Sequence, residues 1–104
     1  MTTTIHRYGK AEVQKWDFEV WNEGRWMGMP FPQPYLTLFN ASTRAVKAVD
    51  PSFRIGGPAS ADMAHVHDFV ANATALKLPF DFVSTHHYPT DSCSPKVRHY
   101  PTCI

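Results

Sequence analysis

Trp16-Asp17-Phe18-Glu19-Val20-Trp21-Asn22-Glu23 is the stretch that decides the fold. Its apolar residues alternate with charged ones, and aromatic and β-branched side chains favour extended backbone, so we predict a strand over residues 16–21. The strand ends abruptly in an amide beside a carboxylate. The glycines and prolines that follow exclude regular structure up to residue 34. The stretch therefore indicates a short strand that presents polar side chains at its carboxyl end.

Two further pairs of helix and strand follow this first strand. Apolar residues at helical spacing predict a helix over residues 35–49, ended by Asp50-Pro51. We expect the next strand at residues 53–58, a second helix over residues 61–78 and a third strand at residues 80–88. Either Ser60 or Asp62 is expected to cap the second helix. A shorter helix is expected to end at Tyr8, before Gly9.

The order strand, helix, strand, helix, strand predicts an α/β fold with a parallel sheet. The strands end in Asn22-Glu23, Gly56-Gly57 and His86-His87-Tyr88. Because the carboxyl ends of parallel strands meet at one edge, where such folds bind ligands, we expect a site there. Three strands leave two unpaired sheet edges, and a closed barrel needs ~250 residues. The chain is therefore either a small open sandwich or a segment of a barrel.

Composition narrows the class of protein. The 104 residues are enough for one small domain, and 43% hydrophobic residues suit a buried core. The net charge is +1 and the basic residues are scattered, so we expect neither a nucleic-acid nor a membrane partner. The N-terminus lacks the apolar core of a signal peptide. Localisation and oligomeric state do not follow from the sequence. Cys93 and Cys103 are equally compatible with a disulfide and with free thiols.

Glu23 is the leading candidate for chemistry. Partial burial between Trp21 and Trp26 would favour its protonated form, which can donate a proton to a leaving group. Asn22 can hydrogen-bond a sugar hydroxyl, and the indole rings offer flat apolar faces on which sugars stack. The alternative is a solvated loop glutamate without a function.

Two residues of the third strand are candidates for the same site. His86 and Tyr88 are two residues apart and share one face, whereas His87 points the other way. They can orient a carboxylate or contact substrate, or they can be hydrogen-bonded residues that cap a core. Gly56-Gly57-Pro58 is predicted to be a tight strand exit that lets the backbone approach a ligand.

We predict no metal site and no cofactor, because the histidines and cysteines lack the spacing of a ligand pair. His65 and His67 face different directions on a helix and are expected to lie at the surface or in packing. Structural roles are expected for three other carboxylates, Asp17, Glu19 and Asp81.

Three blocks of the sequence, residues 16–23, 49–59 and 81–90, resemble glycoside hydrolase family 39 in order and spacing. This family contains β-xylosidases and α-L-iduronidase. The resemblance implies that residues 1–91 are part of a (β/α)8 TIM barrel, about strands 4 to 6 with the intervening helices. Residues 92–104 are expected to form an irregular tail that contains proline and cysteine.

The resemblance also implies a retaining mechanism with two carboxylates. Glu23 matches the general acid/base, Asn22 the residue that contacts the sugar 2-hydroxyl, and His86 and Tyr88 the end of the sixth strand beside the active site. Gly24 stands where the family usually has proline, which loosens this turn. The family carries its nucleophile on the seventh strand, and no carboxylate follows Asp91. We therefore expect the isolated chain to be inactive.

These features predict a fragment of a glycosidase that cleaves terminal β-xyloside or α-L-iduronide bonds, with a carbohydrate as its partner. The family is often secreted or lysosomal. One alternative is a non-catalytic carbohydrate-binding or interaction fragment that uses Asn22, Trp21 and Trp26 as a sugar surface. Another is a truncated gene product without a function of its own.

Overall fold

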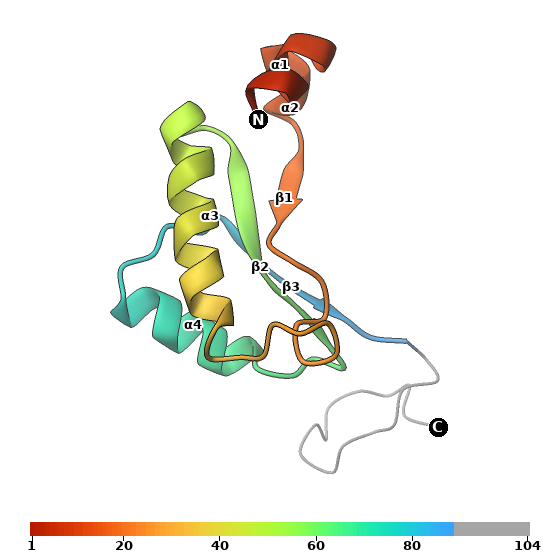
Figure 1. The fold of residues 1–104 in the computed structure, drawn as a ribbon, viewed down its shortest axis with the longest axis vertical. Helices are drawn as coiled ribbons and strands as arrows, with labels where there is room; N and C mark the ends of the chain where they lie inside the picture. Colours follow the sequence, from red (N-terminus) through yellow and green to blue (C-terminus); the bar gives the residue numbers. More distant parts are fainter. Residues whose placement is uncertain (89–104) are drawn as a thin grey trace.

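The framework is a parallel three-stranded sheet with the strand order β1-β2-β3 (Figure 1). A computed structural model describes residues 1–88 of the chain. The strands are β1 (Asp17–Glu19), β2 (Arg54–Ala61) and β3 (Phe82–His86), and the helices are α1 (Thr2–Tyr8), α2 (Lys10–Val13), α3 (Tyr35–Val49) and α4 (Val66–Ala75). The predicted α/β class and its parallel order are thus confirmed. None of these described helices has the length and apolar character needed to cross a membrane.

The strands pair in simple register with one irregularity. Phe18 of β1 lies opposite Ile55 of β2, and Gly57 of β2 lies opposite Val83 of β3. The register shifts between Pro58 and Ser60, where Ala59 is the extra residue. Strand β1 ends at Glu19, and two residues later Trp21 takes a φ of 67°, a left-handed value that a strand does not allow. The observed strands are therefore shorter at their ends than the predicted ranges 16–21 and 80–88.

The core lies between the sheet and the two long helices. Tyr35 and Phe39 on α3 and Phe69 on α4 are fully buried, and the rings of Phe39 and Phe69 meet edge to face at 5.0 Å. Ile55 is the β2 side chain that belongs to the same buried cluster. Both helices therefore cover the same face of the sheet, as Figure 1 shows. Helix α3 has the predicted bounds, because its apolar residues recur at the spacing that this face requires.

The glycine pair lies in the middle of β2 and not at its exit. A Cβ atom at Gly57 would collide with the hydroxyl group of Tyr35, and one at Gly56 would collide with the backbone oxygen of Phe82. The space that these glycines leave is occupied by the chain's own core. The expectation that they let the backbone approach a ligand is therefore wrong, and β2 continues to Ala61.

Helix α4 is shorter than predicted at both ends. Residues up to Ala61 pair with β3, and three of the next four residues take left-handed φ values that an α-helix excludes: Asp62 (51°), Met63 (57°) and His65 (61°). The N-cap is His65 without a side-chain hydrogen bond, so the expected cap at Ser60 or Asp62 is wrong. A φ of 53° at Lys77 excludes helical backbone there, short of the predicted end at residue 78. At the other end of the chain, α1 stops before Gly9 as predicted.

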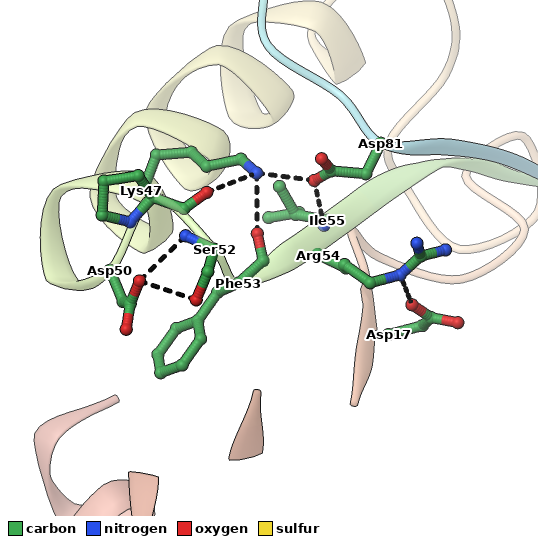
Figure 2. A network of polar contacts seen from close by, with 9 residues as sticks. Asp17, Lys47, Asp50, Ser52, Phe53, Arg54, Ile55 and Asp81 are labelled. Carbon is green, nitrogen blue, oxygen red and sulfur yellow. Dashed lines mark hydrogen bonds and ion pairs between the residues drawn. The ribbon is translucent and has the colours of Figure 1, made fainter. Parts of the chain in front are cut away.

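A polar network secures the amino ends of the strands (Figure 2). The ammonium group of Lys47 donates to the carboxylate of Asp81 at 2.7 Å and to the backbone oxygen of Phe53 at 2.7 Å. The same carboxylate accepts the backbone N–H of Ile55 at 2.8 Å. Burial opposes ionisation of Asp81, but the bonds from Lys47 and Ile55 outweigh it and lower the pKa of this carboxyl group. The network thereby joins the last turn of α3 to the starts of β2 and β3.

Asp50 secures the turn between α3 and β2. Its carboxylate accepts the backbone N–H and the hydroxyl of Ser52, both at 2.8 Å, and pairs with Lys10 at 3.0 Å. The two bonds from Ser52 and then the bond from Lys10 lower the pKa of Asp50. The contact with Lys10 ties this turn to α2, at the start of the chain.

Candidate active site

The carboxyl ends of the three strands bring their polar residues to one edge of the sheet. Glu23, in the loop after β1, contacts His86 at the end of β3. Asp62, directly after β2, contacts His87 with 3.4 Å between Oδ1 and Nδ1. This is the edge at which parallel α/β folds bind their ligands, and it is where the sequence predicted a site.

Glu23 is held by its backbone and by its side chain. Its N–H donates to the backbone oxygen of Ala59 at 2.8 Å, and its own backbone oxygen accepts the N–H of Trp26 at 2.9 Å. The residue takes a left-handed φ of 45°. Its carboxylate oxygen Oε1 lies 3.2 Å from Nδ1 of His86, and the side chain is 25% exposed. Glu23 is therefore an oriented, partly buried carboxylate.

His86 stands between two carboxylates. Its Nδ1 faces Glu23, and its Nε2 lies 3.9 Å from Oε2 of Glu19, the last residue of β1. From the sequence, Glu19 was assigned a structural role only. The alternation of β1 places Glu19 and Asp17 on one face, and Glu19 is the one nearer the carboxyl end, where His86 ends β3. Asp17 pairs instead with Arg54, at the start of β2.

Trp21 and Asn22 lie on the outer side of the turn that leads to Glu23. The indole N–H of Trp21 donates to the backbone oxygen of Met27 at 3.2 Å, and the ring remains 47% exposed. Trp21, Asn22 and Met27 together line a shallow apolar hollow. Asn22 is exposed, so its amide is accessible to a ligand.

Trp26 faces a different hollow. The ring is 67% exposed, and the guanidinium group of Arg25 lies 5.1 Å from its centre. It borders a cavity of about 130 Å³ between the loop after Glu23, the end of β2 and the start of α4, with other lining residues such as Met29, Phe31, Pro58 and His65. The structure thus places Trp26 apart from the hollow that Trp21 and Asn22 share.

The remaining candidates are placed as follows. Tyr88 is 62% exposed, two residues after His86. His65 stacks on Phe31 with 5.1 Å between ring centres, and His67 is exposed, so the predicted packing and surface roles are confirmed. Within residues 1–88, no group of three or more His, Cys, Asp or Glu side chains is arranged to hold a metal ion. Cys93, Cys103 and His99 lie outside the described residues.

The chain is thus a parallel α/β unit in which a carboxylate and an imidazole, those of Glu23 and His86, meet at the carboxyl ends of the strands. The chain belongs to Glycosyl hydrolases family 39, whose sequence profile matches residues 1–100. It is 44% identical over 92 residues to a β-xylosidase of Caldicellulosiruptor saccharolyticus, with 84% of this chain and 18% of that protein covered. It is also 30% identical over 102 residues to human α-L-iduronidase, with 79% of this chain and 15% of that protein covered.

Solved structures show the same relationship. A monomeric β-xylosidase from Caulobacter crescentus CB15 superimposes with a TM-score of 0.77 and 42% identity, over 88% of this chain and 19% of that structure. A family 39 enzyme from Xanthomonas axonopodis pv. citri gives a TM-score of 0.74 and 40% identity, over 82% of this chain and 17% of that structure. The chain thus spans about a fifth of the length of the proteins that it matches.

Proposed function

We propose that residues 1–91 are strands 4 to 6, with their intervening helices, of the (β/α)8 barrel of a retaining glycosidase. The tail predicted for residues 92–104 lies outside the described residues. The support is the successive parallel order of the strands and the two helices on one face, which is how a segment of such a barrel is built. In the described residues β1 and β3 each pair on one side only, which leaves both sheet edges available to neighbouring strands.

In this site Glu23 is the general acid/base. It protonates the oxygen of the leaving group and then, as a carboxylate, activates the water that releases the sugar. The observation that carries this role is the contact of 3.2 Å between Glu23 and His86, which joins the ends of β1 and β3 at the ligand edge of the sheet. A side chain that is mostly buried and yet reachable suits a group that exchanges protons with a substrate.

The other candidates contact the sugar in this proposal. Asn22 offers an exposed amide to a sugar hydroxyl, and Trp21 beside it offers an apolar face. His86 and Tyr88 lie on the strand end across from Glu23 and border the same substrate. Trp26 extends the surface on the far side of the loop.

The nucleophile comes from outside the described residues in this proposal. A retaining enzyme needs its second carboxylate ~5–5.5 Å from the acid, with the sugar between the two. Glu19 does not fit this role, because the imidazole of His86 fills the space between Glu19 and Glu23. We therefore expect the 104 residues, tested as an isolated polypeptide, to hydrolyse neither aryl β-xylosides nor aryl α-L-iduronides.

A chimera tests the proposal. The matched segment of the Caldicellulosiruptor saccharolyticus β-xylosidase is replaced by the matching residues of this chain, and aryl β-xyloside and α-L-iduronide hydrolysis is measured. We expect the chimera to hydrolyse at least one of these substrates. Glu23→Gln should lower the rate of hydrolysis ~10²–10⁴-fold, the range for loss of a general acid. Glu12→Gln makes the same chemical change at an exposed position of α2 and is expected to leave activity unchanged. A folded chimera in which Glu23→Gln is as active as its parent would refute the role of Glu23.

A second candidate function is carbohydrate binding without catalysis. The observation that favours it is the exposure of two indole rings on one polar loop. Xylose added to the isolated chain would then change its tryptophan fluorescence, and Trp21→Phe would reduce this change. No fluorescence change up to high sugar concentration would exclude this function for the isolated chain.

A further inference from the structure

We propose that Glu19 is a positioning residue, which acts on Glu23 through the imidazole of His86. The inference rests on the proposed function of Glu23 as general acid/base. Its basis is the chain of three side chains in which Oε2 of Glu19 lies 3.9 Å from Nε2 of His86 and Oε1 of Glu23 lies 3.2 Å from Nδ1 of the same ring. Each ring nitrogen thus faces its own carboxylate.

His86 has two charged neighbours among the described residues. Among the described residues, the charged side chains that contact His86 are Glu19 from β1 and Glu23 from the loop after it. On β2, Arg54 pairs with Asp17. Asp62, which follows β2, contacts His87 instead. The imidazole is 28% exposed, so solvent only partly screens the two carboxylates.

This arrangement gives Glu19 a definite task. A carboxylate near Nε2 favours a proton on that nitrogen, as partners of an imidazole generally select its tautomer. The lone pair of Nδ1 then faces Glu23 and accepts a hydrogen bond from its protonated carboxyl group. If that proton moves onto Nδ1 instead, Glu23 is ionised and the two carboxylates flank an imidazolium. The charge of Glu19 therefore strengthens the binding of the proton that Glu23 and His86 share.

Removal of the charge of Glu19 should therefore loosen this proton. In the 104-residue chain, we expect Glu19→Gln to lower the midpoint of the NMR titration of the His86 Cε1–H, because it removes the negative charge beside Nε2. Glu19→Asp keeps the charge, so its midpoint should move by at most half as much as that of Glu19→Gln. Glu12→Gln should leave the midpoint of His86 unchanged, because the hydrogen bonds of Glu12 are to Lys15 and Trp16 and not to His86.

The catalytic consequence is measured in the chimera described above. We expect Glu19→Gln to move the alkaline limb of the kcat/KM profile to lower pH by a similar amount, because the acid form is lost earlier. Unchanged His86 titration and an unchanged alkaline limb in a folded Glu19→Gln variant would overturn the inference. A shift that Glu19→Asp reproduces in full would also overturn it, since packing and not charge would then be the cause.

The two proposals fail separately. If Glu23→Gln leaves the chimera active, the proposed function fails, while the titration of His86 still decides whether Glu19 acts on the ring. If Glu23→Gln inactivates the chimera and Glu19→Gln moves neither readout, the inference about Glu19 fails alone.

Discussion

Gly57→Ala should destabilise the fold by disturbing the contact that holds the end of β1. The new methyl group would collide with the hydroxyl of Tyr35, and it would lie 3.3 Å from the ring of Phe39. That hydroxyl donates to the backbone oxygen of Val20 at 3.1 Å, in the buried core and three residues before Glu23. The substitution therefore acts on the segment that carries the candidate acid.

The expected loss follows from two terms. Overpacking of a well-filled core costs ~1–3 kcal/mol. Separation of the Tyr35 hydroxyl from Val20 leaves buried polar groups unpaired, at ~1–3 kcal/mol. Since replacing glycine also restricts the unfolded chain, which returns ~0.4–1 kcal/mol, we expect a net loss of ~1–5 kcal/mol.

A double-mutant cycle isolates the cause. Tyr35→Phe removes the atom with which the methyl group collides, so Gly57→Ala should cost ~1–2 kcal/mol less in the Tyr35→Phe background than in the parent. Gly56→Ala is the matched control, because it collides with the backbone oxygen and the ring of Phe82, which Tyr35→Phe does not relieve. The free energy of unfolding is measured from urea titrations followed by far-UV circular dichroism. Strict additivity of Gly57→Ala and Tyr35→Phe would refute the reasoning.

Three further predictions concern stability. Phe39→Ala should lower the free energy of unfolding by ~3–5 kcal/mol in the same urea titration, because it removes a fully buried ring between the helices and the sheet; a loss below 1 kcal/mol would mean that the helices are not packed as described. Lys47→Met should cost ~1–3 kcal/mol, because it leaves the carboxylate of Asp81 without its cation, and in an Asp81→Asn background the cost should shrink. The pKa values of Asp50 and Asp81 are lowered in the folded state, so their stabilisation is present above the ordinary carboxyl value and is lost as pH falls through the lowered values. The contribution of these two carboxylates should therefore make urea midpoints fall as the pH is lowered below about 5, and a smaller fall in Asp81→Asn is the expected control result.

Much of the fold could be predicted because the ends and types of several elements depend on local sequence patterns. The bounds of α3 follow from its apolar spacing and from Asp50-Pro51, and β1 follows from its alternation and its aromatic residues. The start of α4 could not be predicted in this way. Residues 61–65 have helical apolar spacing, but pairing of Ala61 with β3 and left-handed backbone at Asp62, Met63 and His65 override it. Tertiary pairing thus outweighs local pattern there.

The candidate site shows the same division. The sequence places Glu23 and His86 at strand ends, so their proximity follows from parallel order alone. The third member, Glu19, shares a face with Asp17 and lies nearer the carboxyl end of β1, but only the folded structure shows that its carboxylate reaches His86 while Asp17 pairs with Arg54. The sequence pattern of the glycines at residues 56 and 57 predicts ligand approach, whereas in the structure they accommodate Phe82 and Tyr35. A glycine in a strand indicates a close approach, but only the folded structure identifies which group approaches.

The dependence of hydrolysis on the leaving group tests the central claim most directly, namely that Glu23 supplies the proton. In the chimera, Glu23→Ala should reduce kcat/KM for phenyl β-xyloside at least 100-fold, because a poor leaving group needs protonation. The 2,4-dinitrophenyl β-xyloside, whose leaving group departs without a proton, should lose far less in the glycosylation step, and added azide should restore turnover with formation of the β-xylosyl azide. An equal loss for both substrates, with no rescue by azide, would contradict the account.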